Sequence, residues 1–392
     1  MQHILASSCF KLAGLSKVAC HKVNPLWIHI GYFFSLSLVG FWVLKVLKPR
    51  TDSSKPRNLD LLFTSVSAAT VSSMSTVEME IFSNPQLIVM TIVMFVGGEV
   101  FTSVAGHFMS NSKPKQRRAG ENVASLRSDS SFKPENIVIS GIESRVIMNP
   151  KPGNRQVEEQ THNQGEAFDG EHLMIYHSIK FPSFVVLGYL LVVHLFGVAL
   201  VALYLSLVSS AKDKLKRKGL NLFTFSLFTT VSTFSNCGFV PTNENMLVFA
   251  KNSGLLLILI PQVLQGNTLF PACLRFSIWV LGKVVRKVEY SNYLLKSTRA
   301  IGYHRLLPNR RSCYLVFTVF GFIAAQLIFF CAMEWNSEAF IGLDPYEKII
   351  GLFFQSVNTR HTGETIVDLS TISAAILVLL IVMMSVSLSL SL

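Results

Sequence analysis

Charged residues are scarce in this sequence of 392 residues, since Asp, Glu, Lys and Arg make up only 15% of it. A soluble protein of this size needs far more charge to cover its surface. Hydrophobic residues make up 50% of the chain, and the mean hydropathy is +0.44. The composition excludes an ordinary soluble protein and predicts that much of the apolar surface faces a lipid bilayer.

Patterns of cysteine and histidine that are typical of disulfide frameworks and metal centres are also missing. The cysteines are Cys9, Cys20, Cys237, Cys273, Cys313 and Cys331. They form no CxxC pair, and several lie inside apolar runs, as small buried side chains do. His29, His107 and His194 occur singly in such runs, whereas a di-iron membrane enzyme needs clustered histidines. We therefore expect no enzymatic activity and no cofactor.

The net charge of +12 does not indicate a nucleic-acid partner, because Lys and Arg lie in short clusters between apolar runs. A bilayer core needs about 20 apolar residues per helix. Six segments approach or exceed that length: 26–44, 87–109, 181–211, 253–280, 313–333 and 372–392. Two of them hold a charge, Glu99 in the second and Arg275 in the fourth. We expect Arg275 to extend toward the cytoplasmic face.

Three further segments do not fit the pattern of a full span: 61–77, 220–240 and 349–359. The first two are uncharged but crowded with Ser and Thr, and the third is short. Such backbone is tolerated at membrane depth only where protein or water surrounds it. We interpret them as re-entrant pore loops, each between two spans.

This assignment fixes a topology with the N-terminus and the long connections 110–180 and 283–311 on one side. That side holds 21 of the 35 Lys and Arg residues and the opposite side holds 10, so the N-terminus is expected in the cytoplasm. The polar connection 110–180 is expected to be a disordered cytoplasmic loop. The predicted organisation is residues 1–25, 26–109 (first unit), 110–180, 181–282 (second unit), 283–312 and 313–392 (third unit).

The pore loops repeat in sequence. Val66-Ser-Ala-Ala-Thr-Val-Ser-Ser73 aligns with Val231-Ser-Thr-Phe-Ser-Asn-Cys-Gly238 and, more loosely, with Ser356-Val-Asn-Thr-Arg-His-Thr-Gly363. The following spans correspond as well, since Gly97-Gly-Glu-Val-Phe101 matches Gln265-Gly-Asn-Thr-Leu269. Repeated units in a membrane indicate pseudo-symmetric packing around an axis, which is a natural place for a pore.

Each pore loop begins with the signals of a short helix. Asp344-Pro-Tyr-Glu347 has an N-cap residue, a Pro at the first helical position and a Glu for a capping box. Asn221 is the expected cap of the second helix, and Asn58 or Asp60 that of the first. The C-terminal end of such a helix carries partial negative charge, which favours a cation at the membrane centre.

Acidic residues follow every loop and are expected to form an outer vestibule that concentrates cations. They are Glu78, Glu80, Glu244, Glu364 and Asp368. A solvated rim with no role in transport is an equally open interpretation. His361 is expected to pack or to form a hydrogen bond beside the third loop.

The three loops resemble plant HKT proteins. The resemblance rests on the runs Thr70-Val-Ser-Ser-Met-Ser-Thr-Val-Glu-Met-Glu80, Phe234-Ser-Asn-Cys-Gly-Phe-Val-Pro-Thr-Asn-Glu-Asn-Met246 and Val357-Asn-Thr-Arg-His-Thr-Gly-Glu-Thr-Ile-Val-Asp-Leu-Ser370. It covers about residues 24–384 and extends to the bacterial Trk and Ktr transporters. It implies an all-α integral membrane protein, with six transmembrane helices and three re-entrant pore helices in three span–pore–span repeats of a four-repeat channel fold.

The resemblance also implies the site and the activity. One filter position per repeat gives Ser73, Gly238 and Gly363 as the residues at which Na⁺ is bound. Family members with Ser at the first position resemble sodium uniporters, whereas Gly there usually allows potassium as well. A Cβ and a hydroxyl at one corner narrow a carbonyl site that is sized for potassium. Ordinary turn glycines, and a Ser73 that is one more polar residue of the loop, are the alternatives.

The expected function is passive sodium transport across the plasma membrane. A potassium or mixed sodium–potassium transporter is the alternative within transport. The resemblance implies a fourth repeat, but the 29 residues after Gly363 accommodate one span. We therefore expect no sodium current from this chain alone, because three walls leave polar backbone facing lipid. A non-conducting form that modulates full-length partner subunits is the alternative from another class.

Overall fold

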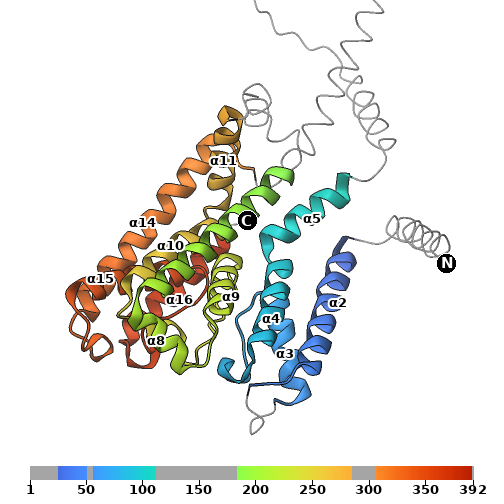
Figure 1. Cartoon of the computed structure of the whole chain (residues 1–392). Coiled ribbons are helices and arrows are strands. Elements are labelled where there is room, and N and C mark those ends of the chain that lie inside the picture. The colour runs from blue at the N-terminus through green and yellow to red at the C-terminus, as the bar shows by residue number, and fades with distance from the viewer. Residues whose placement is uncertain (1–24, 51–55, 112–182, 285–305, 391–392) are drawn as a thin grey trace, which may run out of the picture.

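The computed structural model describes residues 25–50, 56–111, 183–284 and 306–390, and Figure 1 shows how their helices are arranged. The helices are α2 (Pro25–Val46), α3 (Asn58–Ala69), α4 (Asn84–Gly97), α5 (Glu99–Asn111), an unlabelled helix Ser183–Leu207, α8 (Ser209–Arg217), α9 (Leu222–Ser235), α10 (Ser253–Gly266), α11 (Phe270–Val284), α14 (Asn309–Glu334), α15 (Pro345–Asn358) and α16 (Ala374–Leu390). The expected segments 1–25 and 110–180 lie almost entirely outside the described residues, as does most of 283–312.

Three long apolar helices are each followed by a short one, whereas the sixth predicted span, 372–392, is the shorter apolar helix α16. Within the described ranges, three helices are long and apolar enough to cross a membrane: α2, Ser183–Leu207 and α14. Each is followed, directly or after α8, by a short helix that falls in a predicted pore loop, namely α3, α9 or α15. These short helices lie below α5 and α11 in the view of Figure 1.

The second and fourth predicted spans are broken, although the sequence predicts them as continuous. α4 and α5 meet at a bend of 50°, and α10 and α11 at a bend of 88°. At the first break, a Cβ on Gly97 would lie 2.0 Å from the carbonyl oxygen of Ala69, the last residue of α3. At the second, a Cβ on Gly266 would lie 1.8 Å from the carbonyl oxygen of Phe234 in α9. The backbone of each broken span therefore lies in close contact with the end of a short helix. Only glycine fits at these two positions, because a Cβ would clash with that helix.

The helix starts at Asn221 and Asp344 agree with the sequence signals, whereas the N-cap of α3 is Arg57 and neither Asn58 nor Asp60, because Asp60 lies three residues inside the helix start and accepts the bond from the cap. The Asn221 side-chain oxygen accepts a hydrogen bond from the Phe223 N–H (2.9 Å). The Asp344 N–H donates to Glu347 Oε2 (3.1 Å), and the Arg57 N–H donates to Asp60 Oδ2 (3.1 Å). These bonds satisfy N-terminal groups that the helix itself leaves without a partner.

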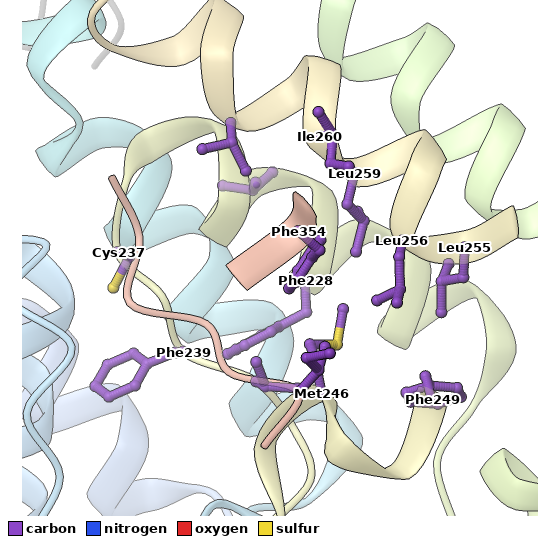
Figure 2. Packing of buried hydrophobic residues seen from close by; sticks show 14 of the residues in the cluster. Phe228, Cys237, Phe239, Met246, Phe249, Leu255, Leu256, Leu259, Ile260 and Phe354 are labelled. Carbon is purple, nitrogen blue, oxygen red and sulfur yellow. The ribbon is translucent and has the colours of Figure 1, made fainter. Parts of the chain in front are cut away.

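The core forms around α9 and α10. Leu255, Leu256 and Leu259 of α10 are buried in one cluster with Phe228 of α9 and Phe354 of α15 (Figure 2). In α9 the buried residues include nearly every position, the hydroxyl-bearing ones among them. α9 is therefore a central helix enclosed by protein, which is the condition that permits a short polar helix at membrane depth.

The outer helices turn large apolar side chains outward. Trp27, Phe34 and Trp42 of α2 are each at least 60% exposed, and Phe317 and Ile328 of α14 are 73% and 67% exposed. Apolar surface of this extent marks contact with lipid or with another protein. Cys237 is buried, as predicted for a small apolar side chain, whereas Cys313 is exposed on α14, and Cys9 and Cys20 lie outside the described residues.

Candidate ion-selectivity filter

The three candidate filter positions share one unusual backbone conformation. Ser73 has φ of 55°, and Gly238 and Gly363 both have φ of 76°. Positive φ costs a residue with a Cβ roughly 1–2 kcal/mol, whereas glycine adopts it freely. Ser73 therefore holds at some cost the conformation that the other two positions reach through glycine.

The loops that carry these positions meet at Gly238. A Cβ built on Gly238 would lie 1.8 Å from the Thr362 carbonyl oxygen and 3.5 Å from the Ser73 Cβ. One residue of the second loop thus contacts both the first loop and the third. No side chain fits there, because the third loop's backbone occupies the space that a Cβ would need.

A backbone hydrogen bond connects each loop to the end of its own short helix. In each case the donor N–H lies five residues after the acceptor carbonyl. The Ser72 N–H donates to the Ser67 carbonyl (3.0 Å), and the Cys237 N–H donates to the Ser232 carbonyl (2.9 Å). In the third loop the donor is Gly363 itself, bonded to Asn358 (3.0 Å). The third loop is thus shifted by one residue, which accounts for the looser sequence alignment there.

Backbone bonds and side-chain bonds also join the second and third loops beyond the filter positions. The Met246 N–H donates to the Thr365 carbonyl (3.0 Å), and the Asn245 side-chain oxygen accepts from the Thr365 N–H (3.3 Å). Thr268, in the break between α10 and α11, lies 3.3 Å from His361 Nδ1. The predicted hydrogen bond of His361 is therefore present, and its partner belongs to a span of the second unit.

Glu364 does not lie on the vestibule rim that the sequence predicts for it. Its side chain is fully buried, and its Oε1 accepts a hydrogen bond from the Thr233 hydroxyl of α9 (2.7 Å). The carboxylate turns away from the loop surface toward α9, so it fastens the third loop to the second unit. Sequence reasoning missed Thr233, although it lies inside the aligned run of the second loop.

Asp368 and Glu78 are exposed, as expected for a rim. The Asp368 carboxylate accepts from the Ser370 N–H (2.9 Å) and caps a short 3₁₀ helix, Leu369–Thr371. Glu78 accepts from the Asn243 side-chain amide (2.7 Å). Neither contact involves a basic side chain, so both carboxylates keep their charge available to an approaching cation.

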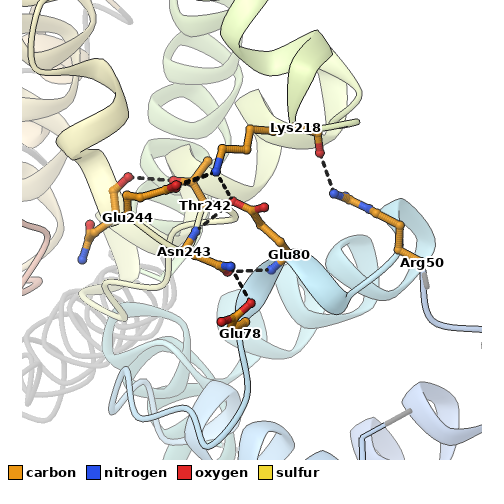
Figure 3. Close-up of polar contacts among 8 residues, drawn as sticks. Arg50, Glu78, Glu80, Lys218, Thr242, Asn243 and Glu244 are labelled. Atoms are coloured by element: carbon orange, nitrogen blue, oxygen red, sulfur yellow. Dashed lines mark hydrogen bonds and ion pairs between the residues drawn. The ribbon is translucent and has the colours of Figure 1, made fainter. Parts of the chain in front are cut away.

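Glu80 and Glu244 instead share a lysine that the sequence analysis did not single out. Lys218 Nζ lies 2.7 Å from Glu80 Oε1 and 2.7 Å from Glu244 Oε2 (Figure 3). The sequence does not indicate this contact, because Lys218 belongs to a basic cluster that serves only to assign the sides of the membrane.

A family model supplies the identification. The model of the TrkH family, described as a cation transport protein, matches residues 146–391, which is more than half of the chain. The chain belongs to the TrkH family. The membership agrees with the resemblance to plant HKT and Trk proteins and makes the chain a multi-pass membrane protein.

Several curated relatives of this TrkH-family chain are plant transporters. A cation transporter of Oryza sativa, HKT1;3, is 45% identical over 93% of this chain, and the sodium transporter HKT1 of Arabidopsis thaliana is 48% identical over 87%. A second rice cation transporter, HKT2;4, is 35% identical over 97%. The alignments cover 66%, 63% and 71% of these relatives' own lengths, so the chain spans about two thirds of them.

Arg275 and Arg360 have structural contacts in this TrkH-family chain. Arg275 Nη1 donates to the Leu307 carbonyl (3.0 Å), a residue that precedes α14. The Arg360 guanidinium lies 5.2 Å from the centre of the Phe322 ring of α14 and is largely buried. Both arginines thus contact the third unit's first span or the segment leading to it.

Proposed function

We propose that this chain provides three walls of a passive sodium path across the plasma membrane, with Ser73, Gly238 and Gly363 as its filter positions. The observation that carries the proposal is the contact of all three loops at Gly238, each loop having a residue with positive φ. Three span–pore–span repeats of a four-repeat channel fold, with a cytoplasmic N-terminus, are the architecture that goes with it.

The chemistry of the site suits a monovalent cation. Backbone carbonyls replace the hydration shell of an ion in such filters, and unusual backbone dihedrals turn those carbonyls toward the path. The three short helices end where the filter loops begin, so the negative ends of their dipoles favour a cation at that place. No covalent step and no cofactor is needed for passive conduction.

Ser73 supports sodium over potassium. Its Cβ lies 3.5 Å from the position that a Cβ of Gly238 would take, so the first wall is bulkier than the other two at the level of the filter. A bulkier corner narrows the carbonyl site and favours the smaller ion. The Arabidopsis relative is named a sodium transporter, whereas the rice relatives are named cation transporters.

Charge introduced at the filter tests the proposal. We would replace Ser73 with Cys and measure uptake of radioactive sodium, and separately of potassium, into proteoliposomes that hold the chain alone or together with the Arabidopsis relative. A cationic thiosulfonate reagent on Cys at position 73 is expected to abolish the uptake that depends on this chain. The matched control is Lys216→Cys, because Lys216 is exposed on α8 and lies outside the filter loops.

The outcomes separate the candidate functions. If the reagent at position 73 blocks sodium uptake by the chain alone, the path is formed by this polypeptide. If it blocks uptake only in the mixed liposomes, the chain is a subunit that shares its walls with full-length partners. Equal potassium and sodium uptake supports the mixed transporter, and chain-dependent uptake unaffected by the reagent contradicts the filter assignment.

A further inference from the structure

Lys218 joins segments from two units of the chain beside the filter loops. It lies between α8 and the short helix α9, whereas Glu80 lies in a 3₁₀ helix after the first filter loop and Glu244 follows the second. Its ammonium group donates to Glu80 Oε1 and to both oxygens of Glu244, each at 2.7 Å (Figure 3). One ammonium group therefore binds two of the carboxylates that the sequence assigns to the vestibule.

Further bonds hold the lysine and its partners in place. The Asn243 N–H donates to Glu80 Oε1 (3.1 Å), and the Glu80 N–H donates to Asn243 Oδ1 (3.2 Å). Arg50 Nη1, from the segment after α2, donates to the Lys218 carbonyl (2.7 Å). Arg50 and Glu80 are thus connected to residues 218–244 by hydrogen bonds of main-chain as well as side-chain groups. Main-chain hydrogen bonds therefore help to hold Lys218 beside its carboxylates.

We propose that Lys218 is a built-in counter-ion that sets the charge at the mouth of the ion path, a role that rests on the proposed function of the loops. With the lysine in place, Glu80 and Glu244 together contribute one net negative charge instead of two. Cations reaching the filter are then concentrated mainly by Glu78 and Asp368. Lys218 is a positioning residue, because it acts on the ion through these carboxylates and not by direct contact.

Lys218 and Glu244 stay ionised over the physiological range. Hydrogen bonds from Lys218 hold the pKa of Glu244 below its ordinary value. Burial acts to lower the pKa of Lys218, but the hydrogen bonds to Glu244 and Glu80 outweigh it and raise that pKa. The ion pair of Lys218 with Glu244 is therefore present from mildly acidic to mildly alkaline pH.

The ordinary interpretation is a surface ion pair that adds little to stability. That interpretation differs in what it predicts, since a pair without effect on stability still changes the local electrostatic potential. A tethered ammonium group also has a high effective concentration at its carboxylates, so free sodium at millimolar levels competes weakly with it. The two interpretations separate when the potential itself is measured.

The potential at the filter mouth can be measured without any ion flux. Met74 follows Ser73 and is 62% exposed, so a Met74→Cys variant reports the potential through its reaction with thiosulfonates. The readout is the ratio of the modification rates by a cationic and an anionic reagent of similar size. The modified peptide is identified by mass spectrometry, because Cys313 is also exposed.

Lys218→Gln is expected to raise this ratio about 2- to 4-fold, because one unit charge at about 10 Å changes each local reagent concentration by about 1.3- to 2-fold in opposite directions. Lys218→Arg should keep the original ratio. Lys216→Gln removes the same charge from an exposed position on α8 and should change the ratio less. These variants carry Met74→Cys throughout.

A double variant separates electrostatics from mechanical support. Lys218→Gln with Glu80→Gln restores the net charge of the triad but not its bonds, so the ratio should return close to the original. A ratio that stays altered in the double variant, or a Lys218→Gln effect no larger than that of Lys216→Gln, would overturn the proposal. Since labelling needs no conduction, a failure of the sodium path in the flux experiment leaves this result readable.

Discussion

Replacing Gly238 with Ala should open the contact between the second and third filter loops. Two effects act on this variant. Positive φ costs Ala roughly 1–2 kcal/mol. In addition, the new Cβ would lie 1.8 Å from the Thr362 carbonyl oxygen, so that the third loop must retreat by more than an ångström. Overpacking of this kind typically costs about 1–3 kcal/mol more.

Gly363→Ala is a matched control for the backbone strain. Gly363 has the same φ of 76°, but nothing lies within 4 Å of the position that its Cβ would take. The two variants therefore share the conformational cost, and only Gly238→Ala has the clash. The difference between them measures the contact of the loops and not the strain of one residue.

The thiol of Cys237 reports the opening, because it is buried beside Gly238. We would follow maleimide labelling of Cys237 in detergent by peptide mass spectrometry. An added destabilisation of about 1–3 kcal/mol predicts labelling roughly 5- to 150-fold faster in Gly238→Ala than in Gly363→Ala. Equal labelling rates would refute the contact between the second and third loops.

Two further changes have expected outcomes. Gly266→Ala places a Cβ 1.8 Å from the Phe234 carbonyl oxygen and should lower the melting temperature in detergent. Gly321→Ala is the control and should not lower it, because nothing lies within 4 Å of the new Cβ. Equal melting temperatures of the two variants would contradict the packing of the broken span on α9. The stability difference between the original chain and Lys218→Gln should be largest between pH 4.5 and 10.5. It should shrink as pH falls through the lowered pKa of Glu244 or rises through the raised pKa of Lys218, and a difference independent of pH would contradict the ion pair.

Much of the fold follows from local sequence signals. Helix starts at Asn221 and Asp344 are set by side chains within a few residues, so they can be predicted without any knowledge of the tertiary structure. The first two filter positions align closely because each comes one residue after the N–H that bonds back to a hydroxyl-rich helix, whereas the third filter position is itself that donor. Local chemistry and internal repetition therefore place Ser73, Gly238 and Gly363 in the same backbone conformation.

The features that sequence reasoning missed depend on contacts between distant segments. The bends at Gly97 and Gly266 arise because another helix end occupies the space beside the span, and hydropathy does not register such contact. Glu364 follows its loop as the other acidic residues do, but its side chain is buried and accepts a hydrogen bond from the Thr233 hydroxyl, 131 positions away. Lys218 likewise has partners that the order of the sequence does not reveal.

The most direct test of the account is the effect of Ser73→Gly on ion selectivity. The reversal potential would be measured in voltage-clamped oocytes that express this chain alone and together with the Arabidopsis relative, while external sodium is exchanged for potassium. The account predicts that Ser73→Gly shifts the reversal potential in potassium toward the value in sodium, in at least one of the two settings. A chain-dependent current whose reversal potentials do not change with Ser73→Gly would contradict the claim that Ser73 is a wall of the selectivity filter.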